Sequence, residues 1–267
     1  MSRTASLVER WGIAILLVLA FLPAVTSPSA SAETGPRAAS VKPLLTGLLD
    51  RDGAPPAAYH GLMDAYALRV LWSDLQPRRT GPLSTRALDQ ALRHAGQRGA
   101  HVKLRVMAGV HAPRWAKRLG GPPMRMVNPT NGHGGTVPRF WTRPFGKAYN
   151  DLQRRLAARY DDRAVLGEVA ISRCTVFYAE PFLRHSTSAS NRSALVRAGY
   201  SRKKDRACHR SEVVAHRVWQ RTRSGLAFNP AQFVTAKGRA VVDDRFTAQM
   251  MSYCRSRLGT RCVLENL

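Results

Sequence analysis

The sequence is short of acidic residues, of lysine and of the motifs that bind nucleotides or metal ions. Its 267 residues include 17 Asp and Glu against 42 Lys and Arg, and only seven of these basic residues are lysine. Neither GxGxxG nor GxxxxGKS/T occurs, so neither a dinucleotide site nor a P-loop is expected. HExxH and CxxC are missing as well, and the eight histidines are scattered. We therefore expect no metal ion and no cofactor.

Long apolar runs are also missing, except for one near the start. Arg3 and Arg10 flank the beginning of an apolar stretch at 11–25, and a small-residue cleavage motif, ASA, stands at 30–32. About 15 apolar residues fall short of the roughly 20 that cross a bilayer. We predict a signal peptide at 1–32, secretion to the extracellular space, and no transmembrane anchor after cleavage.

Cysteine is scarce but even in number. The four cysteines fit an oxidising destination and allow three pairings. We favour Cys254–Cys262, which would close a short loop between a helix and a strand, together with Cys174–Cys208.

The positive charge is large and mostly arginine. The formal net charge is +25, and the cations are spread over most predicted helices and loops, with one dense run at 197–210. Nucleic-acid binders usually cluster cations with aromatic residues, so we expect no specific nucleic-acid partner. A general bias toward arginine explains the spread, and attraction to acidic polymers at a cell surface is the alternative.

Strand-like and helix-like segments alternate from residue 42 onward. The predicted strands are 42–49, 67–75, 101–110, 169–177, 224–233 and 261–267, and the predicted helices are 84–99, 144–162, 211–223 and 244–258. This alternation indicates parallel strands joined by crossover helices. Without a glycine-rich phosphate turn, and with polar residues at several strand ends, a (β/α)8 TIM-barrel type is favoured over an open doubly wound sheet.

Six strands are too few to close such a barrel. We therefore expect an incomplete barrel of about six βα units, forming a single domain at 42–267 after a flexible lead-in at 33–41. Either the domain is truncated at its C-terminus, or the strand count is wrong by one.

The segment 164–184, AVLGEVAISRCTVFYAEPFLR, holds the leading candidate residue. Its β-branched apolar run at 169–177 predicts a strand buried on both faces, and Glu180 and Pro181 follow. An acidic residue just past a buried parallel strand lies where barrel enzymes keep catalytic groups. Glu180 is the predicted catalytic carboxylate; a helix cap or an ion pair with an arginine is the alternative.

Other polar and aromatic side chains are candidates for substrate binding. Aromatic rings suit a half-wet binding cleft, and amides and carboxylates form hydrogen bonds with a polar ligand. The candidates are Asp74, Gln76, His111, Trp115, Trp141 and Asn229. For Trp141 we favour a role in pinning its long loop, and for Trp115 the two roles are equally favoured. For Asp74 we favour a turn cap or an ion pair with an arginine over catalysis, and for Asn229 ligand binding and turn capping are both open.

Four motif pieces carry a resemblance to a known family. LWSDLQP, LRVMAGVHAPRW, VPRFW and YAEPF are similar to the N-terminal two-thirds of β-galactosidase-like secreted glycoside hydrolases, across residues 42–267. That resemblance implies a TIM barrel with catalytic glutamates after strands four and seven. Counting 42–49 as strand one places Glu180 after strand four, as the acid/base. Ala179 stands where the family commonly has asparagine.

The second carboxylate of that family has no clear counterpart. Strand seven lies beyond the six strands counted, and if the count is wrong by one, Glu265 becomes a weak candidate. We expect a secreted glycoside-hydrolase-like protein that acts on or binds a carbohydrate or polysaccharide. The alternatives are a catalytically inactive carbohydrate-binding relic without the nucleophile strand, and a cationic binder of cell-surface polymers.

Overall fold

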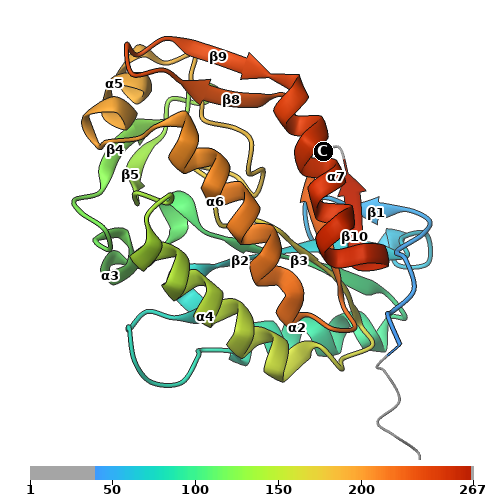
Figure 1. The fold of residues 1–267 in the computed structure, drawn as a ribbon. Helices are drawn as coiled ribbons and strands as arrows, with labels where there is room; N and C mark the ends of the chain where they lie inside the picture. Colours follow the sequence, from blue (N-terminus) through green and yellow to red (C-terminus); the bar gives the residue numbers. More distant parts are fainter. Residues whose placement is uncertain (1–39, 266–267) are drawn as a thin grey trace, which may run out of the picture. The chain divides into compact units, whose positions relative to one another are not determined.

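The computed structural model describes residues 40–265, which belong to one compact unit (Figure 1). The predicted signal peptide and nearly all of the predicted lead-in lie outside the described residues. Among the helices within 40–265, none combines the length and the apolar character needed to cross a bilayer.

Six parallel strands form the central sheet. They are β1 (Leu49–Asp50), β2 (Ala65–Leu71), β3 (His101–Met107), β6 (Leu166–Ala170), β7 (Arg223–Ala227) and β10 (Cys262–Glu265). Their order across the sheet is their order along the chain, and every neighbouring pair is parallel. A doubly wound sheet reverses its strand order at one point, whereas a barrel does not. The sheet is curled into a half-barrel (Figure 1), so the predicted incomplete (β/α)8 fold is confirmed.

Helices flank one face of this sheet, and two hairpins extend from the loops. The helices are α1 (Trp72–Leu75), α2 (Arg86–Gln97), α3 (Arg114–Lys117), α4 (Arg143–Tyr160), α5 (Ala189–Arg197), α6 (Arg202–Ala215) and α7 (Asp244–Leu258). Short 3-10 turns are η1 (Ala57–Tyr59), η2 (Gly109–His111), η3 (His216–Val218) and η4 (Gly259–Arg261). The antiparallel hairpins pair β4 (Met124–Val127) with β5 (Gly134–Val137), and β8 (Ala231–Val234) with β9 (Ala240–Asp243).

The long helices form because their apolar residues recur at helical spacing and their first turns are capped. In α4, Phe145, Tyr149, Leu152 and Leu156 fall on one buried face. The caps of α6 and α7 are side chains: Ser201 accepts from the backbone N–H of Lys204, and Asp243 accepts from that of Phe246.

Alternation along β3 separates the two faces of the sheet. Val102, Leu104 and Val106 belong to the apolar core shared with α2 and α4. Lys103 and Arg105 point the other way, because successive strand residues alternate between faces. We call this second side, which the long helices do not cover, the inner face of the half-barrel.

Several predicted element bounds are wrong. The strand predicted at 169–177 is β6, which ends at Ala170. It ends there because the Glu212 carboxylate accepts the backbone N–H groups of Arg173 and Cys174, at 3.0 and 2.9 Å, which removes them from the ladder. Glu180 therefore stands ten residues beyond the strand, and not directly after it.

Other segments divide more finely than predicted. Only Leu49–Asp50 of the predicted 42–49 strand pairs in the sheet. The predicted strand 224–233 is two strands, β7 and β8, separated at Asn229 and Pro230. The segment 111–143, for which no helix or strand is predicted, contains α3 and the β4–β5 hairpin.

Both predicted disulfides are confirmed. Cys174 pairs with Cys208, 34 residues later, and Cys254 pairs with Cys262, 8 residues later. The first joins the loop after β6 to α6, and the second joins α7 to β10.

We expect the two bridges to contribute unequally to stability. Replacing Cys174 and Cys208 by alanine should lower the free energy of unfolding by about 4 kcal/mol, against about 2.5 kcal/mol for Cys254 and Cys262, because the longer closed loop loses more entropy when cross-linked. Guanidinium unfolding of the two double variants under non-reducing conditions measures both values. Equal losses would contradict the loop-length argument.

Candidate functional site

Charged side chains gather on the inner face, where a closed barrel packs apolar layers. Lys103 Nζ lies 3.1 Å from Glu168 Oε1 and also pairs with the Glu265 carboxylate. Lys103 is 3% exposed and Glu168 is 4% exposed. One ammonium group from β3 thus joins carboxylates from β6 and β10, and the three strands contribute to a single ion cluster.

Two local features of the backbone allow this cluster. The pairing of β3 with β6 shifts register between Val102 and Lys103, whose partners are Leu166 and Glu168. This bulge turns Glu168 to the inner face while Leu166 stays in the core. At Gly225 on β7, a Cβ atom would lie 2.3 Å from Glu168 Oε1 and 2.6 Å from Glu265 Oε1. Glycine therefore leaves the space that the two carboxylates occupy.

The Glu180 carboxylate acts electrostatically on two cations of the inner face. Burial lowers the pKa of Arg105, and among the neighbouring charges the Glu180 carboxylate opposes this most strongly. Burial likewise lowers the pKa of Lys103, opposed first by Glu168 and also by Glu180. Of the two predicted carboxylates, Glu265 is therefore ion-paired in the Lys103 cluster, whereas Glu180 acts on Lys103 and Arg105 through its charge and forms no ion pair with either among the described residues.

Several polar atoms of this cluster have no hydrogen-bond partner among the described residues. They are Nε and Nη2 of Arg105, Oε2 of Glu180 and Oε1 of Glu265, all of them buried. Buried polar atoms are nearly always paired, and leaving one unpaired costs about 1–3 kcal/mol. A ligand rich in hydroxyl groups supplies both donors and acceptors for such atoms.

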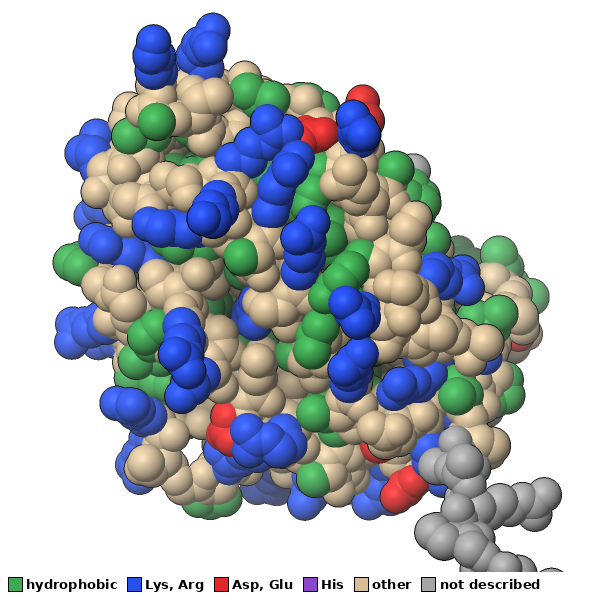
Figure 2. Space-filling view, viewed as in Figure 1, with side chains coloured by type: hydrophobic (Ala, Val, Ile, Leu, Met, Phe, Trp, Pro, Cys, Tyr) green, Lys and Arg blue, Asp and Glu red, His purple; other side chains and the backbone are tan. Residues whose placement is uncertain are grey.

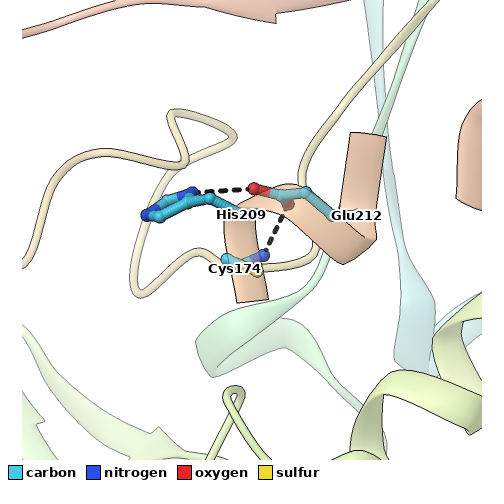
Figure 3. Close-up of side chains that lie close together, drawn as sticks. All are labelled: Cys174, His209 and Glu212. Carbon is cyan, nitrogen blue, oxygen red and sulfur yellow. Dashed lines mark hydrogen bonds and ion pairs between the residues drawn. The ribbon is translucent and has the colours of Figure 1, made fainter. Parts of the chain in front are cut away.

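The loop that carries Glu180 is fixed at both ends by buried polar contacts. At its start, Glu212 accepts from the backbone of Cys174 and lies 2.9 Å from Nδ1 of His209 (Figure 3). At its end, the Arg184 guanidinium donates to both oxygens of Asp205, at 2.9 and 2.7 Å. Both members of that ion pair are fully buried. Glu180 is therefore held between two rigid attachments to α6.

Cys174, His209 and Glu212 lie close enough together to resemble a metal-binding group (Figure 3). The sulfur of Cys174 is already bonded to Cys208, and the Glu212 oxygens accept from backbone N–H groups and from His209. These donor atoms are engaged in holding the loop, so we assign the group a structural role.

The residues that directly follow β6 are structural as well. The Ser172 hydroxyl donates to the carbonyl of Val106 at 2.8 Å. Arg173, 3% exposed, donates to the carbonyl of Cys208 at 2.7 Å and to the Ser211 hydroxyl. Neither carries a carboxylate, and the Glu212 carboxylate that lies against this segment is engaged by its backbone N–H groups.

The other predicted site residues lie apart from this cluster. Gln76 and Trp115 line a cavity of about 590 Å³ beside α4, where Trp115 Nε1 donates to the Gln76 carbonyl at 3.0 Å. His111 lines a second cavity, of about 490 Å³, with His133 and Tyr178. Burial lowers the pKa of His111.

The other three predicted substrate-binding residues, Asp74, Trp141 and Asn229, form contacts with neighbouring side chains. Asp74 is exposed and accepts from the Ser73 hydroxyl at 3.2 Å. Trp141 packs edge-on against Phe140 and Tyr200. The Asn229 carbonyl accepts from the Thr247 hydroxyl at 2.9 Å.

Sequence reasoning missed Lys103, Arg105 and Glu168. A signal was present in HVKLRVM, where cations alternate with apolar residues across a predicted strand. Such alternation indicates one apolar and one polar face, which a strand buried in a closed barrel does not show.

The sheet order and the charged inner face define an incomplete (β/α)8 protein with a polar cluster where a complete barrel has a core. No family model matches the chain, and no curated protein matches it.

Solved structures similar to the chain include three glycoside hydrolases. Endo-glycoceramidase II from Rhodococcus sp. is 15% identical over 82% of this chain and 64% of its own, with a TM-score of 0.43. An exo-β-1,4-mannosidase from Opitutaceae bacterium strain TAV5 is 14% identical over 63% and 26%, with a TM-score of 0.39. β-Glucosidase from Thermotoga maritima is 15% identical over 64% and 36%, with a TM-score of 0.41. The chain spans less than two thirds of these proteins, and the fold assignment rests on its own sheet order.

We expect Lys103 to be essential for stability. Lys103→Met should lower the free energy of unfolding by about 3–5 kcal/mol, because it leaves two buried carboxylates without their shared cation. The added substitution Glu168→Gln should restore part of that loss, since it removes one of the two negative charges. Urea unfolding of the single and double variants measures this coupling, and additive losses would show that the pair does not interact.

Proposed function

We propose that the inner face of the half-barrel binds carbohydrate and that the protein is of glycoside-hydrolase type. The observation that carries this proposal is the buried Lys103–Glu265 ion pair, together with buried polar atoms of Arg105, Glu180 and Glu265 that have no partner among the described residues. Sugar hydroxyls both donate and accept hydrogen bonds, which suits a surface that offers carboxylates and cations together. The resemblance of YAEPF and the other motif pieces to β-galactosidase-like enzymes supports the same class.

Glu180 is the proposed general acid/base for cleavage of a glycosidic bond. Such cleavage needs one carboxyl group to protonate the leaving oxygen and a second to attack the anomeric carbon or activate water. Glu180 is half-buried and is held on a loop that is attached at both ends. Glu265 is the proposed, weaker candidate for the second carboxylate, because its charge is engaged by Lys103.

Binding without turnover is the second candidate function. It is favoured by that same ion pair and by the absence of a carboxylate from the three residues that follow β6, Ile171, Ser172 and Arg173. According to this second candidate function, the inner face binds sugar but has no carboxylate free to act as the nucleophile.

Secretion is part of the proposal. Two disulfides support an oxidising, extracellular destination for the mature chain. The signal peptide proposed at 1–32 would deliver it there.

Hydrolysis of aryl β-glucosides, β-galactosides and β-mannosides by the secreted protein tests the catalytic role. Glu180→Gln should lower kcat/KM at least about 100-fold, as the loss of a general acid/base does. Asp162→Asn, an equal charge change on a largely exposed carboxylate, should leave it unchanged. Activity that survives Glu180→Gln contradicts the catalytic role. Wild-type protein that binds cello-oligosaccharides in calorimetry without cleaving any glycoside selects the binding function, and failure to bind or cleave removes both.

A further inference from the structure

A second region with the character of a binding site lies on the outer side, between α4 and α6. Two hollows of about 930 and 310 Å³ lie there and share Asn150, Ala207 and Ser211. We call this continuous depression the α4–α6 groove. It is separated from the inner face by the core and the sheet, and the proposed carbohydrate site does not use it.

The groove is lined by cations from both helices. They are Arg143 and Lys147 at the start of α4, and Arg202, Lys203, Arg206 and Arg210 along α6. None of the described residues that line either hollow is acidic. Figure 2 shows Lys and Arg side chains spread over this side of the molecule, with few acidic ones among them.

The helical repeat explains why α6 presents cations outward. Positions 203, 206 and 210 share one side of the helix, with Lys203 and Arg210 exposed and Arg206 half-buried, while Asp205, His209 and Glu212 fall on the buried side. The acidic residues of α6 thus form their contacts in the interior and do not neutralise the cations on the outer side. Because the acidic residues of α6 face the interior, the basic residues of the run at 197–210 dominate the solvent-facing side of this helix.

Little of this charge is neutralised within the chain. Asp243 pairs with Arg202 and with Arg206, the latter at 2.6 Å. Within residues 40–265, no ion pair is formed by Arg143, Lys147, Lys203 or Arg210. A row of unneutralised cations along a groove attracts a linear polyanion and aligns it with the groove.

We propose that the α4–α6 groove binds a linear polysaccharide that carries carboxylate or sulfate groups. Asn150 and Ser211 stand among the cations and offer hydrogen-bonding groups for sugar hydroxyls. Trp141 lines one end of the groove, and Tyr253 lines the other. The occupant thus meets charge along the length of the groove and polar or aromatic side chains between the charges.

These features favour an acidic polysaccharide over the other polyanions. Proteins that bind single-stranded nucleic acid interleave cations with several open aromatic faces on which bases stack. Of the two aromatic residues in this groove, Tyr253 has the Arg257 guanidinium over its ring at 5.0 Å. A lipid surface is bound by protruding apolar residues beside cations, whereas these cations line a depression.

Binding of the full secreted chain to polygalacturonate and to heparin, each at several salt concentrations, tests the proposal. Lys203→Gln with Arg210→Gln should weaken binding at least about tenfold at low salt. It should also make the salt dependence shallower by about one to two units of slope, as the loss of two polyanion contacts does. Arg86→Gln with Arg93→Gln, which makes the same charge change at exposed positions on α2, should leave both unchanged.

Three outcomes would overturn the proposal. They are no binding to either polymer, equal weakening by the two double variants, and tighter binding to oligo-dT or to anionic lipid vesicles than to either polysaccharide. Glycoside hydrolysis and cello-oligosaccharide binding at the inner face should be unchanged by Lys203→Gln with Arg210→Gln, so the groove and the inner face are tested separately.

Discussion

The buried ion cluster at Lys103 is the interaction on which the inner face depends. One ammonium group from the middle of the sheet pairs with Glu168 from the next strand and with Glu265 from the last described strand. Two carboxylates this close repel each other unless a cation lies between them, and burial strengthens both the attraction and the repulsion. Lys103 therefore stabilises an arrangement in which β10 carries its acidic side chain back toward β3, and Gly225 leaves room for it.

The position of Glu180 follows from contacts on the other side of the sheet. Glu212 ends β6 by binding the backbone of Arg173 and Cys174, and the disulfide to Cys208 holds the chain against α6. The Arg184–Asp205 pair then fixes the far end of the loop. Between these attachments the chain carries Glu180 to a position from which its charge acts on Arg105. Asp205 and Glu212 of α6 thus face the interior and hold this loop, and the outer side of α6 carries mainly basic residues.

The sequence predicts the fold class and the disulfides, because both depend on local patterns: alternating element types, and cysteines near the ends of elements. It does not predict where β6 ends, because that end is set by Glu212, which lies about forty residues later in the chain. The apolar run through Val176 and Phe177 has strand-like composition, but the run is buried as a loop. The sequence places Glu180 directly after a strand, whereas ten residues of loop separate it from the end of β6. Gln76 and Trp115 are also predicted from their places near strand ends. In the structure, however, Gln76 accepts hydrogen bonds from the indole N–H groups of Trp72 and Trp115.

A crystal structure of the protein grown with cellotetraose tests the central claim most directly. The account predicts a sugar on the inner face, with hydroxyl groups within hydrogen-bond distance of the Arg105 guanidinium and the Glu180 carboxylate, and Lys103 still between Glu168 and Glu265. A sugar ordered only elsewhere, or an inner face in which Lys103 and its two carboxylates are apart, would contradict it.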